Sequence, residues 1–273
     1  MAKTENFNRV VVSILAIPIV LAATYFGGYY FFALVTIISL AAFYEFTLLV
    51  KNKNANANLI FGSLIVFSLL LNQLIKFAEI EVIIVIASLV LLVVELFRNN
   101  GSAIMNLGST FLGIFYIGIF STSLISLREF YFASNETDLY GAFLIISVLA
   151  SIWIGDSAAY YGGTAFGKHK LFQRVSPKKS WEGATFGFIF SLLALILAKL
   201  LVLNFLSWLN VIVIGIIIGT VGQIGDLVES LIKRDSEVKD SSSFIPGHGG
   251  FFDRFDSLLF SAPTIWVYLK LFS

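Results

Sequence analysis

The stretch Leu206–Ile232, LSWLNVIVIGIIIGTVGQIGDLVESLI, is mostly apolar but carries Asp226 and Glu229 near its end. About 20 consecutive apolar residues are enough for a helix to cross a lipid bilayer. A carboxylate at the centre of such a helix costs at least about 2.5–3.5 kcal/mol, so Asp226 must face the interior of a helix bundle, a cation or water. The stretch therefore predicts a transmembrane helix that places a carboxylate near its cytoplasmic end.

The composition agrees with a membrane protein. Hydrophobic residues make up 58% of the 273 positions and charged residues 13%, and the mean hydropathy is +0.90. Soluble domains have roughly 45–50% apolar and about 25% charged residues, so much of this surface must face lipid. The chain has no Cys, which excludes disulfides, thiolate metal sites and Cys nucleophiles.

Further stretches of spanning length extend over the chain, and backbone polar groups in lipid must be paired within helices. We therefore predict an all-α polytopic membrane protein with about nine transmembrane helices. The predicted spans are Val10–Phe26, Phe31–Val50, Ala57–Ile75, Ile80–Phe97, Met105–Leu127, Leu139–Tyr161, Ala184–Leu203, Leu206–Ile232 and Phe255–Phe272.

The Lys and Arg residues predict the orientation of these spans, because they accumulate on the cytoplasmic side of membranes. With a cytoplasmic N-terminus, only Lys76, Arg128 and Lys270 fall in outer loops. The two longest loops, Gly162–Gly183 and Lys233–Arg254, are then both cytoplasmic. We predict a multi-pass protein of the cell inner (plasma) membrane whose active site faces the cytoplasm.

The region Gly222–Asp256, GQIGDLVESLIKRDSEVKDSSSFIPGHGGFFDRFD, holds the strongest functional signal. Glu229 and Ser230 share the helix face of Asp226. A row of small residues on the same helix predicts close approach of another helix or a ligand; it consists of Gly215, Gly219, Gly222 and Gly225.

The loop that follows combines positive charge, glycines and carboxylates. Glycines allow successive backbone N–H groups to converge on an anion. Asp253 and Asp256, three residues apart at a helix start, suit a hard divalent cation. These features predict a metal-dependent site for a polyphosphate. A solvated loop with snorkelling Lys233 and Arg234 is the simpler alternative, but it leaves Asp226 unexplained.

Four other parts of the chain carry polar groups near cytoplasmic helix ends. The segment Ser176–Gly183, SPKKSWEG, places two lysines and a hydroxyl before a helix N-terminus, where phosphates bind. The alternative for this segment is cytoplasmic loop charge with an interfacial Trp anchor. Asp156 lies near the inner end of its span. Glu95 is expected to pair with Arg98, whereas the role of Glu45 stays open.

The spacing S-x-x-K-R-x4-K-D-x5-P-G-H-G-G-x-x-D-R-x-D, from Ser230 to Asp256, resembles the signature of the phosphatidate cytidylyltransferase family. Similar blocks at Gly155–Gly163 and Ser176–Gly183 extend the resemblance over about the C-terminal half. The five N-terminal spans resemble the family only as apolar spans, without a matching motif. We accordingly divide this one integral membrane unit into N-terminal helices, residues 1–138, and catalytic helices with two cytoplasmic loops, residues 139–273.

The resemblance implies transfer of CMP from CTP to phosphatidate, which gives CDP-diacylglycerol and pyrophosphate for phospholipid biosynthesis. It implies Mg²⁺ on Asp226 and Asp253, with room for a second, monovalent cation. The implied catalytic carboxylates are Asp226, Asp253, Asp256 and Asp156. The implied substrate-binding residues are Lys178, Lys179, Ser180, Lys233, Arg234, Lys239, His248, Gly249, Gly250 and Arg254.

The implied partners are CTP, phosphatidate and the lipid bilayer, with no nucleic acid, and a homodimer stays open. Two other functions compete with this one. A polyprenol kinase-like enzyme would share the helices and a basic loop but would release a nucleoside diphosphate. A transporter would explain intramembrane Asp residues, but it would be expected to show repeated halves with broken helices, which this sequence lacks.

Overall fold

The computed structural model describes residues 2–131, 139–245, 247 and 249–273, and within the first helix it describes side chains from Val12 onward. The chain forms two compact units. Unit 1 comprises Met1–Ile125 and Ile232–Arg254, and unit 2 comprises Ser126–Leu231 and Phe255–Ser273. Three helices, α6 (Phe120–Arg128), α10 (Gln223–Asp235) and α11 (Phe252–Phe272), contribute residues to both units.

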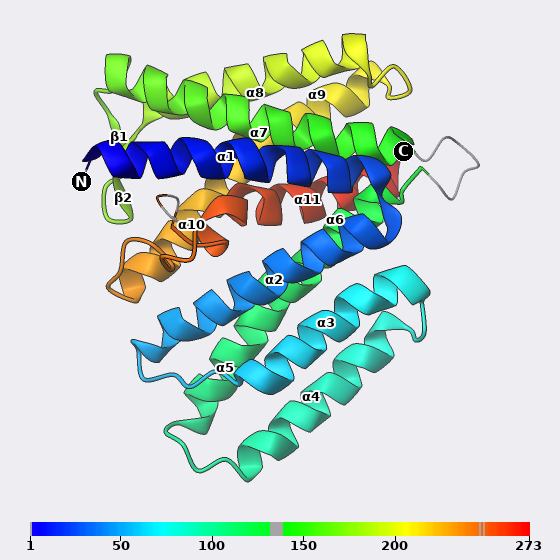
Figure 1. The fold of residues 1–273 in the computed structure, drawn as a ribbon, viewed down its shortest axis with the longest axis vertical. Helices are drawn as coiled ribbons and strands as arrows, with labels where there is room; N and C mark the ends of the chain where they lie inside the picture. Colours follow the sequence, from blue (N-terminus) through cyan, green and yellow to red (C-terminus); the bar gives the residue numbers. More distant parts are fainter. Residues whose placement is uncertain (1, 132–138, 246, 248) are drawn as a thin grey trace. The chain divides into compact units, whose positions relative to one another are not determined.

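Unit 1 contains the N-terminal helices. They are α1 (Ala2–Phe26), α2 (Gly28–Lys51), α3 (Leu59–Ile75), α4 (Ile80–Leu96), α5 (Ala103–Gly113), the π-helix η1 (Ile114–Ile119) and the start of α6 (Phe120–Arg128). Figure 1 shows α3 and α4 side by side as a helical hairpin. Phe43 and Phe46 of α2 are completely buried, and Gly62 and Gly113 leave the space that their rings occupy.

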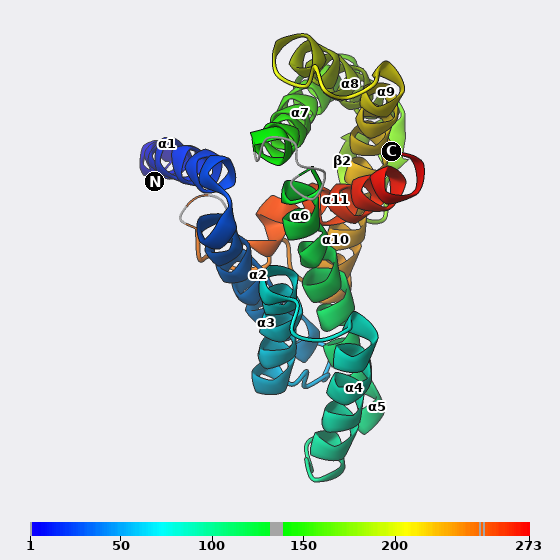
Figure 2. The same cartoon turned by 90° about the vertical axis from the view of Figure 1, so that its right-hand side faces the viewer.

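Unit 2 contains the C-terminal helices and a small sheet. Its elements are α7 (Leu139–Phe166), β1 (Lys170–Phe172), β2 (Ser176–Ser180), α8 (Trp181–Leu201), α9 (Trp208–Ile217), the π-helix η3 (Ile218–Gly222) and parts of α10 and α11. The most extensive helix pair is α7 with α8, which lie side by side in Figures 1 and 2. The strands β1 and β2 pair antiparallel between these two helices, with Lys170 opposite Ser180.

The predicted all-α fold class is confirmed, because each predicted span coincides with helical structure. Among the described residues, five helical stretches are long and apolar enough to cross a membrane. They are Gly28–Lys51, Ala103–Arg128, Leu139–Phe166, Trp181–Leu201 and Trp208–Asp235. Val12–Phe26 and Leu59–Ile75 are apolar but shorter. The count of nine spans and the cytoplasmic N-terminus stay predictions.

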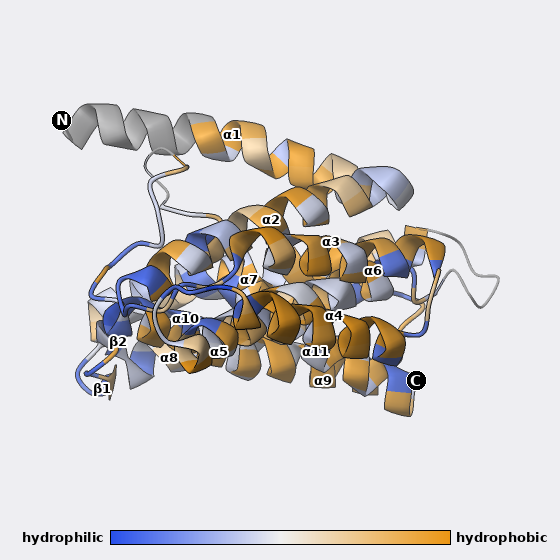
Figure 3. Cartoon of the chain, turned by 90° about the horizontal axis from the view of Figure 1, so that it is seen from below, coloured by the Kyte–Doolittle hydropathy of each residue, from blue (hydrophilic) through white to orange (hydrophobic). Residues whose placement is uncertain are grey.

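The structure adds local detail to the two predicted loops. In the first, α7 continues to Phe166 and the β1–β2 hairpin follows, so its backbone groups pair with one another. In the second, α10 extends to Asp235 and α11 begins at Phe252. Figure 3 shows hydrophobic residues along the helices and hydrophilic ones on the hairpin and on the segment after α10. The two polar segments therefore emerge from apolar helices, as expected. The division at residue 138 stays a prediction, since it separates sequence motifs rather than packed units.

The predicted small-residue face is confirmed and has two partners. A Cβ atom at Gly215 would lie 2.5 Å from Leu192 of α8, and one at Gly219 would lie 2.8 Å from the ring of Phe188. Gly222 and Gly225 face α11 instead, with distances of 2.9 and 2.8 Å to its nearest atoms. The glycines therefore allow α8 and α11 to approach the same helical stretch closely.

The contact at Gly219 predicts a measurable loss of stability. A Cβ there would also lie 3.0 Å from the Cα of Phe188, so Gly219→Ala must displace backbone. We expect it to destabilise the protein by about 1–3 kcal/mol. Gly108→Ala is the matched control, because nothing lies within 4 Å of its added Cβ. Thermal unfolding in detergent should show a lower Tm for Gly219→Ala alone, and equal Tm values would contradict this packing.

Candidate active site

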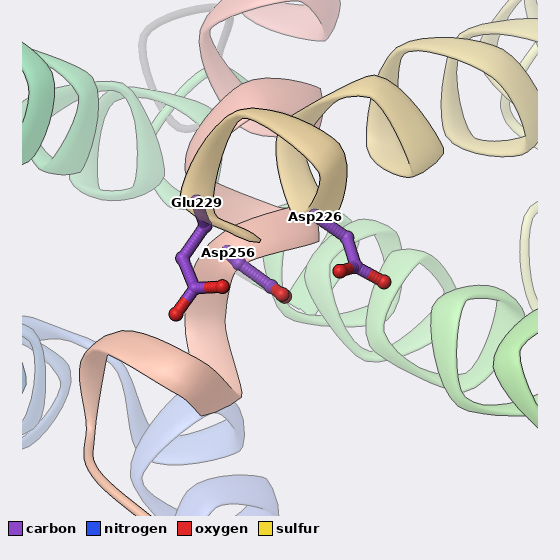
Figure 4. A group of neighbouring side chains, drawn as sticks. All are labelled: Asp226, Glu229 and Asp256. Carbon is purple, nitrogen blue, oxygen red and sulfur yellow. The ribbon is translucent and has the colours of Figure 1, made fainter. Parts of the chain in front are cut away.

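Three carboxylates of unit 2 converge on one point. Asp226 and Glu229 come from α10 and Asp256 from α11, and one oxygen atom from each lies within 4.8 Å of the others. Figure 4 shows the three side chains, with Asp256 between the other two. Glu229 is completely buried. The sequence placed Glu229 on the face of Asp226, but did not single it out as a site residue; the spacing of three residues was the signal for its role.

Close helix packing produces this convergence. A Cβ at Gly225 would lie 2.8 Å from the backbone oxygen of Asp256, so α11 can approach α10 here only because residue 225 is glycine. The π-helix η3 ends at Gly222, directly before α10. Single π-helical turns inside helices occur frequently at functional sites, where they change the direction of the side chains that follow.

Asp226 also contacts the hairpin. The Lys179 ammonium group on β2 forms an ion pair with the Asp226 carboxylate, and the Ser230 hydroxyl donates to its other oxygen at 3.4 Å. The side chains of Lys179 and Asp226 are both 30% exposed, so the pair remains accessible to a ligand. The structure thus brings together Lys179 and Asp226, two residues that the sequence assigned to the same site from segments far apart.

Asp156 borders a small cavity in the same unit. The cavity has a volume of about 20 Å³, enough for about one water molecule. Its lining comprises Ile152, Gly155, Asp156, Ala159, Gly187, Ser191, Ile218, Gly222, Gln223 and Ser257. Ser257 follows Asp256 in the chain, so the cavity that Asp156 borders lies next to the part of α11 that carries Asp256.

The hairpin is held at its base by Glu182. The Glu182 carboxylate accepts hydrogen bonds from the backbone N–H groups of Lys168 and His169, and lies 2.6 Å from the His169 ring nitrogen Nδ1. The Ser180 hydroxyl caps α8 by accepting from the Gly183 N–H at 3.2 Å. Lys178 is exposed. Substrate binding by Lys178 and Ser180 stays a prediction.

In unit 1, Asp253 is surrounded by donors. Its Oδ1 accepts from the Lys233 ammonium group at 2.7 Å. Its Oδ2 accepts from the backbone N–H groups of Ser241 and Gly250 and from the Ser241 hydroxyl, at 2.8–2.9 Å. Gly249 has φ +78°, which favours glycine. The loop N–H groups do converge on an anion, as the glycines suggested, and that anion is Asp253. Its role as a metal ligand stays a prediction.

The remaining predicted contacts lie on the surface or outside the described residues. Arg234 donates to the backbone oxygen of Val238 at 2.8 Å, and Lys239 and Arg254 are exposed. His248 lies outside the described residues. The predicted Glu95–Arg98 ion pair is confirmed at 3.3 Å. The substrate contacts assigned to these cations stay predictions.

Glu45, which the sequence left open, lies beside the segment Lys233–Arg254. Its carboxylate accepts hydrogen bonds from the hydroxyls of Ser241 and Ser242 and from the N–H groups of Phe251 and Phe252. The sequence showed only that Glu45 is a carboxylate near the end of an apolar helix. The residues around it in α2 gave no indication that its hydrogen-bond donors lie about 200 residues later in the chain.

Comparison with known proteins gives consistent results. The model of the family described as "Cytidylyltransferase family" matches residues 7–272. A Bacillus subtilis protein named phosphatidate cytidylyltransferase is 32% identical over 271 residues, covering 97% of this chain and 98% of its own. Proteins of the same name from Brucella suis and Synechocystis are 33% and 28% identical, each covering 97% of this chain; the matches cover 94% and 96% of their own lengths.

The three carboxylates suit a divalent cation. Oxygens that share one Mg²⁺ lie at most about 4.2 Å apart, because each Mg–O distance is about 2.0–2.1 Å. Small side-chain rotations would bring oxygens that now lie within 4.8 Å to this separation. We expect Mn²⁺ to bind the detergent-solubilised protein, and Asp256→Asn and Glu229→Gln each to weaken binding about tenfold or more.

Electron paramagnetic resonance of free Mn²⁺ during titration measures this binding directly. Glu95→Gln is the control, since Glu95 is a buried carboxylate of unit 1 that binds Asn106 and Arg98. Its affinity should equal that of the wild type. Unchanged affinity in both Asp256→Asn and Glu229→Gln would show that the cluster does not hold the ion.

Proposed function

Since the chain belongs to the cytidylyltransferase family, we propose that it transfers CMP from CTP to phosphatidate, forming CDP-diacylglycerol and pyrophosphate. The observation that carries this proposal is the signature Ser230–Asp256, which supplies Asp256 to a carboxylate cluster beside Lys179. The relatives named phosphatidate cytidylyltransferase match over nearly their full lengths, so no large part of them lacks a counterpart here. The kinase and transporter alternatives find no such support.

The proposed reaction does not require a side chain to remove a proton from the nucleophile. A phosphate monoester has a second pKa near about 6, so the lipid phosphate is largely dianionic at neutral pH. One of its oxygens attacks the α-phosphorus of CTP; a new P–O bond forms, the bond to the β-phosphate oxygen breaks, and pyrophosphate leaves with its electron pair. The residues of the chain then have to hold the two phosphates in line and neutralise their charge.

Lys179 is the best placed cation for this task. It already pairs with Asp226 beside the cluster and is partly exposed, so it can donate to a triphosphate oxygen. Lys178 and Ser180 share its strand. We propose further contacts from the second polar segment, through Lys233, Arg234, Lys239, His248, Gly249, Gly250 and Arg254.

We propose that Asp226, Glu229 and Asp256 hold the divalent ion, and that Mg²⁺ is the natural one. A bound Mg²⁺ supplies charge neutralisation and orientation at phosphate oxygens. Asp253 remains a proposed ligand, and Asp156 remains a proposed catalytic carboxylate; it borders a cavity that is also lined by Ser257, the neighbour of Asp256. We also propose that a second, monovalent cation binds at this site and that the protein forms a homodimer.

The family and the apolar helices indicate a multi-pass membrane protein. We propose the cell inner membrane, with a cytoplasmic N-terminus and active site. Two arguments support this orientation. Most Lys and Arg residues fall on the cytoplasmic side of the predicted topology, and CTP is a cytosolic substrate.

Activity should depend on the cluster and on Lys179 in different ways. Purified protein with labelled CTP, phosphatidate and Mg²⁺ should form a lipid-soluble nucleotide and pyrophosphate, and EDTA should abolish both. Asp226→Asn and Asp256→Asn should lower kcat about a hundredfold or more, because they remove charge neutralisation in the transition state. Lys179→Ala should mainly raise KM for CTP. Release of CDP instead of pyrophosphate would identify a kinase.

The orientation can be tested by single-cysteine labelling, because the chain has no native Cys. Ser243 and Glu79 are both exposed, and the predicted topology puts them on opposite sides of the membrane. In intact spheroplasts, a membrane-impermeant maleimide should label Glu79→Cys but not Ser243→Cys. Labelling of Ser243→Cys before lysis would reverse the proposed topology.

A further inference from the structure

A buried carboxylate of α2 organises the functional segment of unit 1. Glu45 is completely buried. Its Oε2 accepts from the Ser241 hydroxyl at 2.8 Å and the Phe252 N–H at 2.9 Å. Its Oε1 accepts from the Ser242 hydroxyl at 2.6 Å and the Phe251 N–H at 3.0 Å. Three of these donors come from the polar segment between α10 and α11, and the fourth is the N–H of Phe252, the first residue of α11.

These bonds match what an ionised carboxylate requires. Its two oxygens offer about four lone-pair sites, and four donors fill them. The N–H groups of Phe251 and Phe252 belong to the start of α11, where unpaired N–H groups and the helix dipole favour a negative charge. Glu45 therefore acts on the first turn of α11 as a cap supplied by another helix.

The same carboxylate is connected to Asp253 through one hydroxyl. The Ser241 Oγ lies 2.8 Å from Glu45 Oε2 and 2.9 Å from Asp253 Oδ2, and it has a single proton to share. A Cβ at Gly250 would lie 2.1 Å from that hydroxyl and 2.3 Å from Glu45 Oε2. The loop can thus contact Glu45 this closely only with glycine at position 250.

Further contacts hold the same segment against α2. Phe252 packs edge-on against Phe46, with ring centroids 6.2 Å apart. The Asn52 side-chain amide donates to the backbone oxygen of Ser236 at 3.2 Å, and Lys53 pairs with Glu237 at 3.0 Å. The exposed Lys53 pair adds little stability. Glu45 is the contact that combines full burial with bonds at both ends of the loop.

We propose that Glu45 is a positioning residue for the cytidylyl transfer, a role that rests on the proposed function. Through the hydroxyls of Ser241 and Ser242 and the N–H groups of Phe251 and Phe252, it holds the loop between α10 and α11 at two places, Ser241–Ser242 and Phe251–Phe252. That loop carries Gly249 and Gly250, and Arg254 follows it in the first turn of α11; all three are proposed phosphate contacts. Glu45 acts through this loop, since its four hydrogen bonds go to Ser241, Ser242, Phe251 and Phe252.

The test compares Glu45→Gln with Glu95→Gln, a second buried carboxylate of the same unit whose partners, Asn106 and Arg98, lie outside the loop. A glutamine keeps the size of the side chain but offers one acceptor oxygen and turns an NH₂ group toward the remaining donors. We expect Glu45→Gln to lower kcat about tenfold to a hundredfold, because a displaced loop misplaces phosphate contacts. Glu45→Asp, which keeps the charge, should recover part of the loss.

A second measurement reports loop conformation without catalysis. Lys239 is exposed and lies two residues before Ser241, the first residue that Glu45 binds, so trypsin cleavage after Lys239 reports local opening. Cleavage should be about tenfold faster in Glu45→Gln than in the wild type and unchanged in Glu95→Gln. Equal losses of kcat and Tm in the two glutamine variants would overturn the proposal, since Glu45 would then act only on overall stability. Unchanged cleavage in Glu45→Gln would overturn it as well.

Neighbouring serines provide a milder comparison in case Glu45→Gln does not fold. Ser242 donates to Glu45 at 2.6 Å, whereas Ser243 is exposed. Ser242→Ala should speed cleavage after Lys239 and lower kcat, and Ser243→Ala should match the wild type. Identical behaviour of the two variants would refute the positioning role. If the wild type itself forms no CDP-diacylglycerol, the proposed function fails, and the cleavage rates still decide whether Glu45 holds the loop.

Discussion

The negative charge of a carboxylate among apolar helices must be balanced by nearby hydrogen-bond donors or cations, and this electrostatic requirement determines local structure in both units. In unit 1, hydroxyl and backbone N–H donors of one loop surround Glu45, and Lys233 with the same loop surrounds Asp253. In unit 2, Lys179 compensates Asp226, while Glu229 and Asp256 converge with it. The first arrangement fills the acceptors with protein donors and fixes a backbone. The second gathers acceptors around a point, which leaves capacity for a cation or for the positive groups of a substrate complex.

Glycine residues make the carboxylate arrangements of both units sterically possible, in two different ways. Along α9, η3 and α10 it removes side chains between helices, so that α8 and α11 approach and Asp256 meets Asp226. In the loop it removes a side chain between backbone and carboxylate, as Gly250 does beside Glu45. A single type of residue therefore serves helix packing in one unit and anion contact in the other. Gly225 and Gly250 are thus conditions for assembling the two carboxylate arrangements.

The sequence predicted those features whose causes are local or compositional. Apolar length predicted the helices, spacing along one helix predicted the glycine face, and the separation of three residues predicted the Glu95–Arg98 pair. The β1–β2 hairpin was missed because its strands are short and Pro177 interrupts the donor pattern of β2. Glu45 could not be assigned, because its partners lie almost 200 residues later in the chain and only the fold brings them together. Local spacing fixes which residues share a helix face, but only tertiary structure fixes what that face meets.

The N-terminal helices supply contacts to a segment that lies far from them in the sequence. The motifs quoted from the sequence lie in the C-terminal half, whereas the family match extends over residues 7–272 and so includes the N-terminal helices. Among these helices, α2 supplies the carboxylate that accepts from the first turn of α11, and Phe46 and Tyr116 pack around Phe252 at the same place. Without these helices, two N–H groups and the Ser242 hydroxyl would lose their acceptor, and the Ser241 hydroxyl would be left with Asp253 alone. The segment that bears the motif is therefore ordered in part by residues outside it. A single buried carboxylate of α2 and the rings beside it connect the N-terminal helices to the start of α11.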